Sequence, residues 1–154
     1  MTAFSATQIA NWFVARAARD GEVLTNLKLQ KLLHVANGWH LHFTSKELFG
    51  DQIEAWPYGP VVPTPYHAFK SFGAGGVSLI APPAELTGTT LKVAEAVWKS
   101  YGNIPATTLV AMTHRPGTPW HEVYDDGQGR GSVIQTINIK KHYAELAKQN
   151  STAN

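Results

Sequence analysis

The sequence predicts a mainly α, compact helical domain of about six to seven helices with a small β element. Apolar residues recur at helical spacing on two long segments before residue 44, and glycine and proline clusters divide the rest of the chain into short pieces. Short extended stretches among these pieces predict strands near residues 52–56, 77–80 and 133–136.

The first helix is predicted to begin after Ser5 and to end at Asp20-Gly21. Ser5 and Gln8 have the three-residue separation of a capping box, in which each side chain accepts a hydrogen bond from the other residue's backbone N–H. Apolar residues at helical spacing mark its inward face: Ile9, Trp12, Phe13 and Ala17.

The second helix, capped by Thr25 or Asn26, has the clearest pattern in the chain. Its large residues follow helical spacing for four turns: Leu29, Leu32, Leu33, Ala36, Trp39, His40 and Phe43. A stripe this wide and continuous is typical of the central helix of a core. We therefore expect this helix to pack against the first one.

A proline-rich segment then interrupts the helical pattern. Residues 58–65 hold three prolines and one glycine, so this segment is predicted not to be helical. Thr64-Pro65 starts a short helix that Gly73 closes, because Thr is a good cap and Pro fits the first helical position. Residues 73–86 are predicted to be a loop.

Four further helical stretches are expected after this loop. They span about 89–101, 105–112, a turn beginning at Thr118-Pro119, and 138–148. Residues 125–131 are predicted to be a flexible loop. No long linker divides the chain, so residues 1–149 are expected to form a single domain, followed by a disordered tail over 150–154.

The composition excludes several classes of function. The chain has no cysteine, which excludes disulfides, thiol catalysis and cysteine-ligated metal sites. Its net charge is only +2 and its basic residues are scattered, which does not favour nucleic-acid binding. Neither a signal peptide nor a membrane-spanning apolar run is apparent, so we expect a cytoplasmic protein that does not bind membranes.

No group of residues predicts catalysis, and we expect neither a metal nor a cofactor. On the second helix, His34, His40 and His42 lack the i, i+4 spacing that places two imidazoles on one face for a metal. The glycines at 127, 129 and 131 lack the preceding strand and following helix of a phosphate-binding loop. The protein is predicted not to be an enzyme. The alternative of a site assembled in space from distant His and Glu residues stays open.

Two proline-stiffened loops carry aromatic residues and are candidate binding surfaces. One covers residues 56–62 and the other residues 114–120. Rigid aromatic side chains lose little freedom on docking, which favours protein binding. The alternative that these aromatic residues pack into the core also stays open. The predicted partner-binding residues are Tyr58, His67, Lys70, Arg115 and Trp120.

The order of two motifs is familiar. The segment Leu24-Thr25-Asn26-Leu27-Lys28-Leu29-Gln30-Lys31-Leu32-Leu33 precedes Glu54-Ala55-Trp56 and Tyr58-Gly59-Pro60-Val61-Val62-Pro63. This order resembles the Panacea-domain family of SocA-like antitoxins, which includes phage-associated proteins, over about residues 5–146. The residues expected to form a structural signature are Leu29, Lys31, Leu32, Trp56, Gly59, Pro60 and Val61.

The resemblance implies an antitoxin that neutralises a cognate protein toxin by direct binding. It implies, as an alternative, an adaptor that delivers the toxin to a ClpXP-type protease. A signature common to antitoxins with different toxins is expected to hold the fold. Specificity for the partner is therefore expected to lie beside residues 56–62, while the oligomeric state is not predicted.

Overall fold

The computed structural model describes residues 4–152, and within them a central helix is surrounded by shorter elements. These residues form seven α-helices, two short 3-10 helices and one two-stranded sheet, which confirms the predicted fold class. The α-helices are α1 (Ala6–Arg19), α2 (Asn26–Thr44), α3 (Pro63–Ala68), α4 (Gly88–Tyr101), α5 (Ala106–His114), α6 (Pro119–Tyr124) and α7 (Thr136–Thr152). The 3-10 helices are η1 (Lys70–Phe72) and η2 (Asp125–Gly127).

The start of α1 is fixed by two independent caps. Ser5 and Gln8 form the predicted capping box, with the Gln8 N–H donating to Ser5 Oγ at 3.2 Å and the Ser5 N–H donating to Gln8 Oε1 at 3.0 Å. The Asp51 carboxylate accepts a further bond from the Ala6 N–H at 2.8 Å. A carboxylate at a helix N-terminus also interacts favourably with the helix dipole. The segment that follows α2 is thereby tied to α1.

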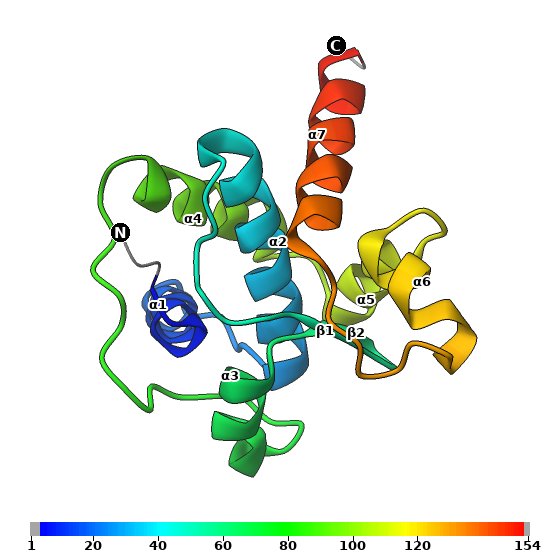
Figure 1. Ribbon diagram of the computed structural model, residues 1–154. Coiled ribbons are helices and arrows are strands. Elements are labelled where there is room, and N and C mark those ends of the chain that lie inside the picture. The colour runs from blue at the N-terminus through cyan, green and yellow to red at the C-terminus, as the bar shows by residue number, and fades with distance from the viewer. Residues whose placement is uncertain (1–3, 153–154) are drawn as a thin grey trace.

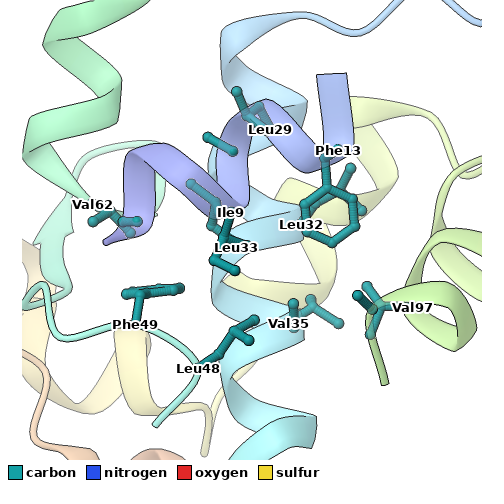
Figure 2. Packing of buried hydrophobic residues seen from close by; sticks show 14 of the residues in the cluster. Ile9, Phe13, Leu29, Leu32, Leu33, Val35, Leu48, Phe49, Val62 and Val97 are labelled. Atoms are coloured by element: carbon teal, nitrogen blue, oxygen red, sulfur yellow. The ribbon is translucent and has the colours of Figure 1, made fainter. Parts of the chain in front are cut away.

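The core forms where α1, α2 and α4 meet, as predicted for α2. Figure 2 shows Ile9 and Phe13 of α1 facing Leu32 and Leu33 of α2, with Val97 of α4 beside them. The helix α2 also contacts α5, α7 and β2 (Gly59–Val61), so it is buried around most of its circumference. Its side chains therefore meet protein in every direction for most of its length.

Phe43 departs from the predicted inward stripe of α2. Its side chain is 63% exposed, although it continues the helical spacing of the buried residues. It lies in the last turn of the helix, where its ring stacks on Trp39 at a centroid distance of 6.0 Å and meets the ring of His42 at 4.9 Å. Its ring neighbours thus belong to its own helix, and the covering elements leave it in contact with solvent.

The small sheet is a hairpin of β1 (Glu54–Trp56) and β2, joined by a two-residue turn. A third segment follows the other edge of β1, where the Ala55 N–H donates to the Ser132 carbonyl at 2.9 Å and the Ile134 N–H to the Ile53 carbonyl at 2.8 Å. The predicted strand near 133–136 is therefore an isolated bridge between Glu54 and Val133. The loop before it turns tightly, because Gly129 lies against the backbone of Val123 without room for a Cβ atom.

The predicted strand over 77–80 is wrong. This segment is extended but pairs with no strand, because its backbone bonds go elsewhere. The Val77 N–H donates to the Leu24 carbonyl at 2.8 Å, and the Ile80 N–H donates to the buried Asn11 side chain at 3.1 Å. These bonds attach the segment to α1 and to the turn that joins α1 to α2.

The last helix is longer than predicted at both ends. It begins at Thr136, two residues before the predicted cap Asn138, and continues to Thr152, past the predicted end at Lys148. Residues 150–152 of the predicted disordered tail are thus helical, and residues 153–154 lie outside the described residues. In Figure 1 the C-terminal end of α7 extends beyond the other helices.

Across residues 4–152, none of the helices has both the length and the apolar character that a bilayer span requires.

Candidate functional site

Polar side chains on the buried helix α2 hold the irregular chain that follows it. Gln30 Oε1 accepts from the Val62 N–H at 2.9 Å, and Asn26 Nδ2 donates to the Tyr66 carbonyl at 3.0 Å. Two turns after Gln30, Asn37 Oδ1 accepts from the Leu48 N–H at 2.9 Å. A buried backbone group without a partner would cost about 1–3 kcal/mol. These amides therefore give hydrogen-bond partners to three backbone groups of residues 48–66 that lie outside the β1–β2 ladder.

Lys31 is the charged member of this polar face, and its side chain is fully buried. Its ammonium donates to the Pro60 carbonyl of β2 at 3.1 Å. No carboxylate forms an ion pair with it among the residues of the described structure. Burial accordingly lowers the pKa of Lys31 to about 7, because the charged form loses its hydration.

The hairpin turn lies directly over the Lys31 side chain. Gly59 has a φ of +115°, a conformation that residues with a Cβ avoid. An added Cβ atom would also lie 2.8 Å from Lys31 Cε and 3.0 Å from Thr113 Oγ1. Glycine is therefore required here both by backbone conformation and by close packing.

The backbone on both sides of the turn is fixed, while its tip is exposed. Trp120 Nε1 donates to the Trp56 carbonyl at 2.6 Å, and Lys31 holds the Pro60 carbonyl on the other side. His114 lies close to the backbone of Tyr58, and this interaction opposes the lowering of the His114 pKa by burial. The Tyr58 side chain is nevertheless 71% exposed, which makes it a projecting side chain on a firmly held backbone.

The prediction of Trp120 as a partner-binding residue conflicts with its position, because the side chain is only 6% exposed. Its ring stacks on His114 at 3.9 Å with an interplanar angle of 8°, and on Tyr124 at 4.6 Å with an angle of 15°. Both faces of the indole are covered and its N–H is bonded to Trp56. Trp120 of the second proline-rich loop therefore packs into the fold. Burial also lowers the pKa of His114, whose ring stacks on Trp120.

The other predicted partner-binding residues lie on the surface near the turn. His67 and Lys70 are exposed on the short helical segment that follows β2, and the His67 ring lies 6.0 Å from the ring of Trp56. Arg115 is exposed at the end of α5, next to His114, which lies close to the Tyr58 backbone. Contacts through Trp56 and His114 thus link these surface residues to the same turn.

The predicted signature residues divide between the core and the hairpin. Leu29 and Leu32 are fully buried on α2, on either side of Lys31 in sequence. Gly59, Pro60 and Val61 form the buried strand β2, whereas Trp56 of β1 is half-buried. The Lys31–Pro60 hydrogen bond and the packing of Gly59 on the Lys31 side chain bring the two groups together.

Sequence analysis missed a second buried group, where α7 crosses α2. Tyr143 of α7 lies edge-on to His34 at 5.9 Å, and its ring occupies the space that a Cβ atom would need at Gly38. Burial lowers the pKa of His34 to about 3, with the charges of Lys31 and His142 acting in the same direction. The available signal was Gly38 itself, since a glycine inside a long helix often marks close packing.

These buried groups are suited to support and not to catalysis. Lys31 and His34 are enclosed in packed protein, so a substrate has no access to either side chain. Within the described residues, no group of three or more His, Asp or Glu side chains could hold a metal ion. The arrangement provides a rigid base for an exposed surface around Tyr58.

Comparison with known proteins assigns the family. Residues 29–121, which run from α2 to the start of α6, match the family model described as "Antitoxin SocA-like, Panacea domain". The chain belongs to this family. It is similar to the Antitoxin SocA of Caulobacter vibrioides (strain NA1000 / CB15N), with 31% identity over 138 residues that cover 80% of this chain and 72% of that protein. No solved structure matches the chain.

Gly59→Ala is expected to lower the free energy of unfolding by about 2–4 kcal/mol, because it combines backbone strain with a clash against Lys31. Urea denaturation measures this change. Gly50→Ala is the matched control, since Gly50 has no atom within 4 Å of the added Cβ position. We expect the control to change stability by less than about 0.5 kcal/mol. Equal effects of the two substitutions would contradict the packing described for the turn.

Lys31→Met is expected to remove a rise of stability with pH. Between the folded pKa of about 7 and the ordinary value of 10.5, the unfolded state binds one more proton at Lys31 than the folded state does. Stability should therefore rise with pH by about 1.4 kcal/mol per unit in this window. Urea denaturation between pH 8 and 9.5 would give the slope. The exposed Lys92→Met should keep the wild-type slope, and a Lys31→Met slope as steep as wild type would show that Lys31 stays protonated.

Proposed function

We propose that this protein is an antitoxin that neutralises a cognate protein toxin by direct binding. The observation that carries the proposal is the Tyr58 turn in a chain that belongs to the SocA-like antitoxin family. Its side chain is 71% exposed, and the backbone on either side of it is held by Lys31 and Trp120. A large side chain left exposed on a backbone that is fixed from beneath is suited to contact a partner.

Physical chemistry supports a binding role for this surface. A preorganised turn loses little conformational entropy when it docks, so more of the contact energy appears as affinity. Tyrosine and arginine are also the residue types that most often dominate binding energy at protein interfaces. Tyr58 and Arg115 are the exposed members of these types here, with Lys70 and His67 adding cationic or polar contacts.

The test is co-expression with the product of the neighbouring reading frame. A toxic product whose effect is suppressed by this chain, and which is pulled down with it, would support the proposal. Absence of both suppression and binding would contradict it. The half-life of the toxin distinguishes the two mechanisms, because direct blocking leaves the half-life unchanged. A half-life shortened by co-expression would instead support the adaptor that delivers the toxin to a ClpXP-type protease.

Tyr58→Ala is expected to weaken toxin binding by about tenfold or more while leaving Tm unchanged, because the side chain contributes to the surface and little to the core. Arg115→Ala should behave similarly. Trp120→Ala should instead destabilise the protein by about 3–5 kcal/mol, since it removes a buried ring. Pull-down and thermal melting, measured on the same samples, separate these outcomes.

Leu79→Ala is the matched control for loss of an exposed apolar side chain, since Leu79 is 51% exposed on the segment after η1. We expect it to change neither binding nor Tm. If Tyr58→Ala lowers Tm and reduces binding only in proportion to the loss of folded protein, the turn is not a binding surface.

A further inference from the structure

A groove of about 800 Å³ lies between the turn that joins α5 to α6 and the exposed side of α7. We call it the α5–α7 groove. One wall is the stripe on α7 formed by Asn138, Lys141, His142, Glu145, Leu146 and Gln149. These positions repeat at helical spacing, and the eleven steps from first to last extend about 16 Å at 1.5 Å per residue. The groove is therefore about three helical turns long.

The opposite wall is held firmly by Thr118. Its Oγ1 lies 2.8 Å from the carbonyl oxygens of both Thr113 and Arg115, and it accepts from the His121 N–H at 3.2 Å. Pro116 and Pro119 on either side of it restrict the backbone further. This wall is therefore preorganised, which lowers the conformational entropy that is lost when a partner binds.

The groove combines apolar contacts with charged side chains that form no ion pair among the described residues. Met112 of α5 and Leu146 of α7, both half-buried, line it from opposite sides. The charged residues along its walls are Arg115, Glu122, Lys141 and Glu145. The ion pairs of the described structure connect Arg16, Arg19, Asp20 and Glu95, and none includes a charge of the groove. Opposite charges thus face the groove without reaching each other.

We propose that the α5–α7 groove receives an amphipathic helix of the toxin. The helix lies along α7, places apolar side chains between Met112 and Leu146, and directs an acidic side chain at Lys141 and a basic one at Glu145. This inference rests on the proposed function, because it names the element of the toxin that the antitoxin binds. The surface is continuous with the Tyr58 turn through Arg115, which lines the groove and follows His114.

The shape and charge of the groove favour a helix as the occupant. Lys141 and Glu145 are four residues apart on α7, so a helix lying beside α7 meets them with an acid and a base that are also one turn apart. Helix-in-groove recognition uses anchors at this spacing. An extended segment would need a strand edge for its backbone, and every residue that lines the groove lies in a helix or a helix-joining turn.

The first test exchanges the two α7 charges. The double variant Lys141→Glu, Glu145→Lys keeps the net charge and the composition, and places a glutamate before a lysine at i, i+4, which favours the helix. We expect Tm to be unchanged and the Kd for the toxin to rise about tenfold or more, because two attractive contacts become repulsive. Lys92→Glu on α4, exposed and outside the groove, is the control and should leave the Kd within about twofold.

The outcomes separate this inference from the proposed function. If the wild-type protein neither binds nor neutralises the product of the neighbouring reading frame, both are overturned. If the wild-type protein binds it and the charge exchange leaves the Kd unchanged, the groove inference is overturned while the antitoxin function stands. If the exchange changes only self-association, measured by analytical ultracentrifugation, the groove binds a second copy of this chain and the inference is again overturned.

A second test identifies the occupant, and it uses the absence of cysteine from the sequence. A single cysteine in Asn138→Cys, on the exposed end of the groove, accepts a maleimide photo-crosslinker. We expect cross-links to one helical, amphipathic segment of the same toxin, identified by mass spectrometry. Lys92→Cys is the control position and should give few cross-links. Equal cross-linking from both positions, or cross-links to a strand of the toxin, would refute a helix in the groove.

Discussion

The burial of α2 on almost every side is the constraint on which the rest of this structure depends. The polar side chains of a helix in that position need hydrogen-bond partners within the protein, and α2 carries several such side chains. Gln30, Asn26 and Asn37 meet this need by bonding the backbone of the chain that follows the helix. The same hydrogen bonds thus pair the buried amide side chains of α2 and the backbone groups of the irregular segment, which would otherwise both lack partners. The path from α2 through the hairpin to α3 follows from these pairings more than from strand or helix propensity.

Lys31 adds a charge to this arrangement, at a cost that apolar packing would avoid. Its ammonium is directed at a strand carbonyl and lies against a residue without a side chain, so three features of the sequence depend on one another: a lysine in a leucine-rich helix, a glycine and a proline. The result is a surface turn, at Tyr58, whose conformation is fixed by the buried side chain of Lys31.

Much of this fold is predictable from the sequence, and the failures have common physical causes. The capping box of α1 and the central position of α2 could be predicted, because both follow from the spacing of residues that are close in the sequence. Trp120 and Phe43 were assigned to the wrong environments, because aromatic spacing does not reveal which side of an element another element will cover. The segment 77–80 has an extended backbone, but its partners are a side chain and a helix-joining turn that lie far away in sequence. Of the candidate site, the turn itself was predictable; the stack of His114, Trp120 and Tyr124 beneath it was not.

The crossing of α7 over α2 has a consequence for the outer surface. Because Gly38 has no side chain, the ring of Tyr143 rests on the backbone of α2. Another face of the same helix forms one wall of the α5–α7 groove. The absence of a side chain at residue 38 therefore determines how closely α7 can approach α2. Since α7 also forms a wall of the α5–α7 groove, this buried glycine influences the width of a groove on the outer surface.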